Sequence, residues 1–154
     1  MNTPIPGYEE SLEIHTLILD LNGTITEDGI LIEGVKERIN AIREKAIRIF
    51  LFTGDTLGTG AKIAQELGLE FRLTKTSQAK ADETKKLNPE TAATIGNGRI
   101  DLELFKTVRF RICVIQAEGA YTETLLNSDV VMNSINDALD FFLKPNRMIG
   151  TLRK

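Results

Sequence analysis

The sequence predicts a doubly wound α/β domain, in which a mostly parallel sheet carries helices on both faces. Two observations predict this fold. Short apolar runs alternate with segments of helical period, and polar glycine-rich segments follow three of the apolar runs. Such alternation favours parallel strands joined by crossover helices. The chain has 154 residues, which is near the usual size of one domain.

Six apolar runs have the length of buried strands. They cover residues 14–19, 47–52, 69–73, 92–95, 110–115 and 130–132. The segments between several of these runs have helical character. Val35, Ile39 and Ile42 fall on one face of an expected helix over residues 34–46. A second helix is expected over residues 60–68, with Gly68 at its end, and a third over residues 134–143, with Ser134 as its cap.

We expect one folded domain over residues 13–144, between two terminal segments. Residues 1–12 are expected to form a flexible arm, because Pro4, Pro6 and Gly7 interrupt any periodicity. Residues 145–154 are expected to form a basic, solvated tail.

Composition excludes several classes of function. A net charge of −3 and a pI near 5.3 argue against a nucleic-acid partner and against a membrane-binding basic patch. Cys113 lies within an apolar run, as expected of a buried thiol in a reducing compartment. The first residues do not resemble a signal peptide, and no apolar run reaches the length of a transmembrane helix. We therefore expect a cytoplasmic protein.

Three polar segments directly follow predicted strands. They are DLNGTIT (residues 20–26), TGDT (residues 53–56) and GNGRID (residues 96–101). In doubly wound sheets, ligands bind outside the carboxyl ends of the strands, so these segments fall on the functional edge. Any one of them is ordinary turn chemistry. Their convergence favours a phosphate and metal site.

These motifs resemble those of the haloacid dehalogenase (HAD) superfamily of phosphatases and phosphotransferases, which have a Rossmann-like fold. Within that superfamily they are similar to the phosphorylation domain of P-type ATPases, whose motifs read DKTGT[LI]T, TGD and GDGxND. The segment LNSDVVMNSINDAL (residues 126–139) is also similar to a segment that follows in those pumps. The resemblance spans residues 14–143 and is strongest to small soluble P-type-ATPase-like proteins.

The resemblance implies a role for each motif residue. Asp20 is the nucleophile that forms an aspartyl-phosphate. Phosphoryl oxygens are bound by the Gly23 and Thr24 turn and by Thr53 and Gly54. Asp55 matches a pump aspartate beside the phosphorylation and nucleotide region. The implied cofactor is Mg²⁺, with Asp20, Asn22, Asn97 and Asp101 as the metal-site residues.

The superfamily also uses a lysine that neutralises the nucleophile and the phosphoryl group. We assign it to Lys80, which we expect to open the helix after the third strand. Lys75 and Lys85 are the alternatives. On a helix surface, removal of Lys80 is expected to leave the fold intact.

Two asparagines depart from the phosphatase motifs. Asn22 replaces the aspartate that acts as general acid and base, which predicts slow turnover. Asn97 replaces a direct Mg²⁺ ligand, and an amide brings no charge to a hard cation, which predicts weak metal binding. Asp101 remains as a ligand that binds directly or through water.

The intervals between the motifs are too short for a cap domain. Residues 25–32 have room for a small flap with a turn at Asp28 and Gly29. An open site is expected to act on a small phosphorylated substrate or a phosphoprotein, and homo-oligomers are plausible by analogy. The sequence thus predicts a Mg²⁺-dependent HAD hydrolase. The alternative is a catalytically degenerate module that binds phosphate, nucleotide or a protein partner.

Overall fold

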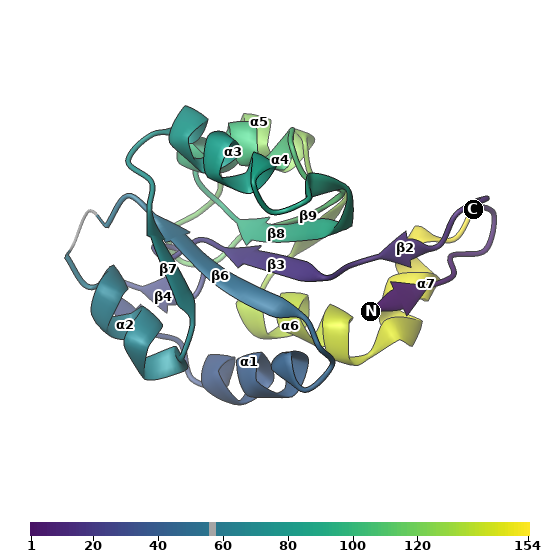
Figure 1. Cartoon of the computed structure of the whole chain (residues 1–154), viewed down its shortest axis with the longest axis horizontal. Coiled ribbons are helices and arrows are strands. Elements are labelled where there is room, and N and C mark those ends of the chain that lie inside the picture. Colours follow the sequence, from purple (N-terminus) through teal and green to yellow (C-terminus); the bar gives the residue numbers. More distant parts are fainter. Residues whose placement is uncertain (56–57) are drawn as a thin grey trace.

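A six-stranded parallel sheet forms the centre of the molecule (Figure 1). The structure, a computed structural model, describes residues 1–55 and 58–154. The strand order is β10-β9-β8-β3-β6-β7. After β3 the chain adds β6 and β7 on one side, and it then crosses to the other side of β3 to add β8, β9 and β10. The strands are β3 (Thr16–Leu19), β6 (Arg48–Thr53), β7 (Glu70–Leu73), β8 (Ala92–Gly96), β9 (Phe110–Val114) and β10 (Val130–Met132). The predicted doubly wound α/β fold is confirmed, and the strand ends differ from prediction by at most two residues.

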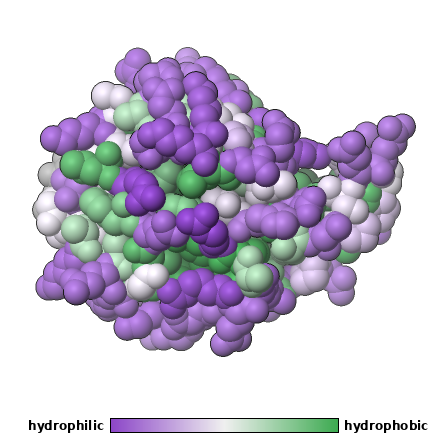
Figure 2. Space-filling model, in the orientation of Figure 1, coloured by the Kyte–Doolittle hydropathy of each residue, from purple (hydrophilic) through white to green (hydrophobic). Residues whose placement is uncertain are grey.

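Helices cover both faces of the sheet (Figure 1). One face carries α1 (Val35–Arg43), α2 (Gly60–Leu67) and α6 (Ile135–Leu143), and the other carries α3 (Ser77–Lys85), α4 (Leu102–Phe105) and α5 (Thr122–Leu126). Two short 3₁₀ turns, η1 (Pro89–Thr91) and η2 (Arg99–Asp101), precede β8 and α4. Figure 2 shows hydrophilic residues over the helices and hydrophobic surface in the band between the two helical layers.

The core is divided by the sheet because side chains alternate between its faces along each strand. In β3, Leu17 and Leu19 join the large cluster under α1, α2 and α6. Ile18 points the other way and joins a smaller cluster with Phe50, Phe52, Ala92, Leu104 and Val108. These residues are buried on both faces of the central strands, which explains their continuous apolar runs.

Helix boundaries follow local capping chemistry. The Ser134 side chain accepts hydrogen bonds from the amides of Asn136 and Asp137, as predicted for a helix cap. Helix α2 ends at Gly68, which has the left-handed conformation. Helix α3 begins earlier than predicted, because Thr76 caps it and Ser77 is its first residue. Lys80 therefore lies within the first turns of α3 and does not open the helix.

The terminal segments pack together at the end of the sheet opposite the polar motifs (Figure 1). Residues 1–12, expected as a loose arm, include β1 (Asn2–Thr3), which pairs antiparallel with β2 (Leu12–Glu13). Residues 145–154, expected as a solvated tail, contain α7 (Pro145–Leu152). Ile5, Leu12 and Met148 are buried. These few apolar side chains, spaced without a clear period, attach both ends to the core.

The expected flap is a two-stranded hairpin that follows the first motif. Strand β4 (Thr26–Glu27) pairs antiparallel with β5 (Ile30–Leu31). The turn residues Asp28 and Gly29 have φ of 50° and 78°, which suits a tight hairpin turn. No helix in the two described ranges is long and apolar enough to cross a membrane.

Candidate active site

The three polar motifs meet at the carboxyl ends of three adjacent strands. Leu19 of β3 is paired with Leu51 of β6 on one side and with Ile95 of β8 on the other. Asp20 therefore emerges between the other two motifs. This is the point where the strand order reverses, and it is where ligands bind in open α/β sheets.

Lys80 bridges two carboxylates at the centre of the site. Its Nζ lies 2.5 Å from Asp20 Oδ1 and 2.6 Å from Asp101 Oδ1. Lys80 is fully buried, with 0% of its side chain exposed, so its expected position on the helix surface is wrong. Of the alternatives, Lys85 pairs with Asp82 on the surface of α3, and Lys75 is exposed. The structure thus brings together residues that are 60 and 21 positions apart in sequence.

Asp20, Asp101 and Lys80 form a buried trio whose charges do not cancel. Burial and the neighbouring Asp101 raise the pKa of Asp20 to about 6, against the opposing effect of Lys80. Burial acts to lower the pKa of Lys80, but Asp101 and Asp20 outweigh it and hold that pKa above its ordinary value. Lys80 therefore stays protonated. When both carboxylates are ionised, the trio carries one net negative charge.

Asp101 is held from two sides. Its Oδ2 accepts hydrogen bonds from the amides of Asn97 (3.1 Å) and Gly98 (2.9 Å), while its Oδ1 accepts from Lys80. A β-carbon on Gly96 would lie 2.6 Å from Asp101 Oδ2, so a glycine is required there. Both oxygens of Asp101 are thus engaged within the protein. Asp101 Oδ1 accepts one bond only, so it keeps a lone pair with which it could bind a metal directly or through water.

The turn after Asp20 is closed by its own backbone. The amide of Gly23 donates to the Thr26 carbonyl (3.0 Å), and that of Thr24 donates to the Leu21 carbonyl (3.2 Å). A phosphoryl oxygen could use these two N–H groups only if they left those carbonyls. Gly23 has φ of 73°, and a β-carbon on it would lie 2.3 Å from Asn97 Nδ2. The turn and the last motif are therefore in direct contact.

The two asparagines have different surroundings. Asn97 is engaged at both amide atoms, because its Oδ1 accepts from the Thr24 hydroxyl (3.2 Å) and its Nδ2 donates to the Gly119 carbonyl (2.9 Å). Asn22 Oδ1 is buried and has no hydrogen-bond partner within the described residues. A buried oxygen without a partner costs free energy, typically about 1–3 kcal/mol. Asn22 Oδ1 is thus a buried acceptor that the described residues leave unsatisfied.

The second motif orients a hydroxyl and begins a helix. Thr53 is buried, and its Oγ1 accepts from the Asp55 amide (2.9 Å), which leaves the hydroxyl hydrogen available to another acceptor. Asp55, with φ of 52°, accepts from the Gly60 amide and so caps α2. Gly54 lies between these two residues. Thr56, the last residue of the predicted motif, lies outside the described residues.

The residues present fit a divalent cation held by few protein ligands. Two buried carboxylates face one buried cation, so the trio has an excess negative charge when both carboxylates are ionised. In the part of the chain that the structure describes, no three His, Cys, Asp or Glu side chains gather as a metal cluster. Mg²⁺ commonly binds through one or two carboxylates and keeps several waters. This donor set suits a weakly bound Mg²⁺.

Gln116 is a residue of the site that the sequence analysis missed. Its side chain contacts the carbonyls of Gly23 and Thr24, in the turn after Asp20. Gln116 follows the carboxyl end of β9 by two positions, so the strand-end criterion that identified the three motifs could also have found it.

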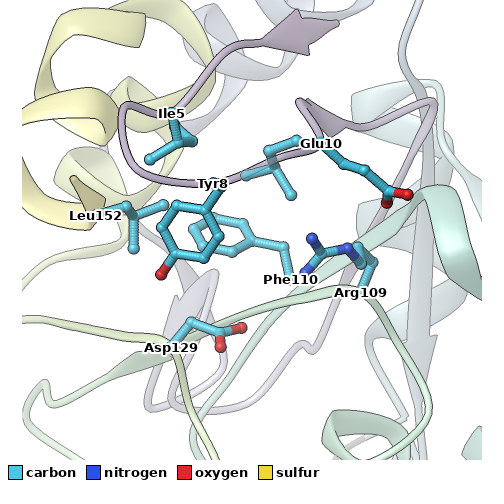
Figure 3. Close-up of a pocket in the computed structure, with 8 residues that line it drawn as sticks. Ile5, Tyr8, Glu10, Arg109, Phe110, Asp129 and Leu152 are labelled. Carbon is cyan, nitrogen blue, oxygen red and sulfur yellow. The ribbon is translucent and has the colours of Figure 1, made fainter. Parts of the chain in front are cut away.

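A separate cavity lies at the opposite end of the sheet. Its volume is about 100 Å³, and it lies between the N-terminal hairpin, α7 and the start of β9 (Figure 3). Arg109 and Glu10 lie on one side of it, and Leu152 lies on the other. It is therefore not part of the candidate site.

Sequence comparison finds two informative relatives, both from Methanocaldococcus jannaschii. The uncharacterized protein MJ0073 is 48% identical over 73 residues, which is 47% of this chain and 78% of that protein. A soluble P-type ATPase-like phosphatase is 24% identical over 143 residues. That match covers 90% of this chain, which spans about half (52%) of the phosphatase. No family model matches.

Comparison with solved structures finds the same fold. One similar structure is 3-deoxy-D-manno-octulosonate 8-phosphate phosphatase from Moraxella catarrhalis, in complex with magnesium ion, phosphate ion and KDO. It is 21% identical with a TM-score of 0.69, over 91% of this chain and 94% of that one. This chain has the fold of these HAD-family hydrolases, and it belongs to the same family as MJ0073.

Proposed function

We propose that this chain is a Mg²⁺-dependent phosphatase or phosphotransferase that works through an aspartyl-phosphate on Asp20. The observation that carries the proposal is the fully buried Lys80, which bridges Asp20 and Asp101. Asp20 has a pKa of about 6, so its carboxylate is ionised above this pH. The buried positive charge of Lys80 attracts a phosphoryl group. The phosphatase relatives support the same chemistry.

In the first step, the Asp20 carboxylate oxygen that Lys80 leaves free attacks phosphorus. A bond forms between this oxygen and phosphorus as the phosphorus–oxygen bond to the leaving group breaks. The leaving oxygen keeps the electron pair and takes a proton from water. In the second step, a water oxygen bonds to the same phosphorus as the bond between Asp20 and phosphorus breaks. The attacking water gives a proton to solvent, phosphate leaves, and the Asp20 carboxylate is restored. Transfer to an alcohol in place of water would give a phosphotransferase.

Protein groups around Asp20 would stabilise the charge on the phosphoryl oxygens. Lys80 supplies a buried positive charge, and the Thr53 hydroxyl and Gly54 supply hydrogen-bond donors. Gly23 and Thr24 shape the turn, and their N–H groups would join after exchanging their present partners. Mg²⁺ would be held by the Asp20 carboxylate, the backbone carbonyl of Asn22 and Asn97, with Asp101 binding directly or through water. When bound, it would neutralise phosphoryl charge.

Turnover is expected to be slow because Asn22 has no proton to transfer. A positioned acid–base group typically contributes about 10²–10⁴ in rate. Leaving groups that need no protonation should therefore react best. The intervals between the motifs leave no room for a cap domain, and a flap of residues 26–31 follows the first motif, which suits a small phosphorylated molecule or a phosphoprotein as substrate.

The second candidate is a degenerate module that binds phosphate, a nucleotide or a protein partner without turnover. The observation in its favour is Asn97, whose amide atoms are both engaged within the protein at the position of a metal ligand. The two functions differ in turnover: the enzyme would hydrolyse a phosphorylated substrate when Mg²⁺ is bound, and the binding module would not.

The proposal is tested by hydrolysis of an activated aryl phosphate in a Mg²⁺ titration. We expect slow hydrolysis by the natural protein that is lost on chelation of the metal. The Asp20→Asn variant keeps the size of the side chain but lacks the nucleophile, so it should have no activity above background. Equal hydrolysis by both proteins would contradict the proposal.

A further inference from the structure

Residues 116–121 contact three separate parts of the site. Gln116 contacts the turn after Asp20. The Glu118 carboxylate accepts from the Asp28 amide at the tip of the flap (3.0 Å). Gly119 accepts from the Asn97 side chain, and the Tyr121 amide donates to the Asn97 carbonyl (2.8 Å). This segment thus links the first motif, the flap and the last motif.

Gln116 makes the most direct of these contacts. Its Nε2 donates to the Gly23 carbonyl (3.1 Å) and to the Thr24 carbonyl (2.9 Å). Its Oε1 accepts from the Ile135 amide (2.7 Å). The three bonds use both ends of the side-chain amide, so they define its orientation.

The Ile135 bond attaches the turn to a rigid element. Ile135 is the first residue of α6 and is fully buried. The Ser134 cap serves the amides of Asn136 and Asp137, and Gln116 serves that of Ile135. The Ile135 N–H has no partner within α6 because it lies in the first turn, and it donates to Gln116 Oε1 instead. The position of the turn is set by a helix packed in the core.

The contact extends to the metal side of the site through Thr24. The Thr24 carbonyl is held by Gln116, while its hydroxyl donates to Asn97 Oδ1. A shift of the Thr24 backbone would move the Asn97 amide, which lies against Gly23. Gln116 thus holds the turn after Asp20 directly and holds Asn97 through Thr24.

We propose that Gln116 is a positioning residue for phosphoryl transfer, which holds the turn after Asp20 and, through Thr24, orients Asn97. This inference rests on the proposed function. It predicts that replacing Gln116 lowers kcat strongly while the free energy of unfolding changes little. The reason is that a displacement of about 1 Å in a catalytic group can cost about 10² in rate. Binding of the substrate by Lys80 and Thr53 would be retained.

The test is steady-state hydrolysis of an aryl phosphate by Gln116→Glu. This variant keeps the shape of the side chain but replaces Nε2 with an oxygen, which cannot donate to the Gly23 and Thr24 carbonyls. We expect kcat to fall about tenfold to a hundredfold with KM within about twofold of the natural protein. Gln78→Glu is the matched control, because Gln78 contacts the exposed Asp82 on α3, and its kcat should be unchanged. If Gln116→Glu fails to fold, Gln116→Met replaces it, with the same expected loss.

A double-mutant cycle separates positioning from general support of the fold. Thr24→Val removes the hydroxyl that reaches Asn97. If Gln116 acts through Thr24, the losses in kcat from Thr24→Val and Gln116→Glu should not add. Unchanged kcat in both Gln116 variants, or fully additive losses, would overturn this inference alone. Absence of hydrolysis by the natural protein would overturn the inference together with the proposed function.

Discussion

Replacing Lys80 with methionine is expected to lower the free energy of unfolding by about 3–5 kcal/mol near neutral pH. The reason is the uncompensated charge that remains. Lys80 is fully buried between Asp20 and Asp101, and both carboxylates are also buried. Methionine fills much of the same space but leaves two carboxylates facing each other without a cation.

The cost of Lys80→Met should decrease as the pH falls. The pKa of Asp20 is already raised to about 6 with Lys80 present, and loss of the lysine would raise it further. Protonation of Asp20 in acid therefore removes part of the unpaired charge. The measurement is urea denaturation of both proteins near pH 7 and near pH 4. The control is Lys85→Met, whose exposed pair with Asp82 contributes little to stability. A cost below about 1 kcal/mol at neutral pH would contradict the buried trio.

Replacing Asn22 with aspartate is expected to raise kcat by about 10²–10⁴ at saturating Mg²⁺. The new carboxyl group would protonate the leaving oxygen and then take a proton from the attacking water. The site favours this role. Asn22 Oδ1 is buried without a partner among the described residues, so burial should raise the pKa of a carboxyl group added there.

Asn97→Asp provides the contrasting variant. It should lower the Mg²⁺ concentration needed for activity without raising kcat, because it adds a charged ligand and no proton donor near the leaving group. Both variants are compared by hydrolysis of an alkyl phosphate, whose leaving oxygen needs a proton, over a Mg²⁺ titration. An unchanged kcat in Asn22→Asp would show that the missing acid does not limit the site, and the binding module would then be the better account.

Much of the fold was predictable because its signals are local. Apolar runs such as residues 47–52 have the length of buried strands, and Ser134 and Gly68 have the local chemistry of helix ends. The convergence of the polar motifs was also predictable, because parallel strands place their carboxyl ends at one edge. These inferences needed no knowledge of how distant side chains pack.

The burial of Lys80 could not be predicted from its neighbours. In SQAKADETK it looks like one of several charged residues on a surface helix. What decides its burial is the position of Asp20, which follows β3, and of Asp101, which lies in η2 after β8. The bonds of the Gly23 and Thr24 amides and the position of Gln116 likewise depend on tertiary packing. Sequence patterns identified which segments meet, while the structure determined which atoms within them are engaged.

The central claim is that Asp20 accepts a phosphoryl group with the help of Mg²⁺. The most direct measurement is the melting temperature with Mg²⁺ and beryllium fluoride, which together mimic an aspartyl-phosphate. At about a hundredfold excess over the dissociation constant, binding adds about 2.7 kcal/mol, or roughly 5–10 °C for a domain of this size. We predict this rise for the natural protein and no rise for Asp20→Asn. Equal shifts in both proteins, or no shift in either, would contradict the claim.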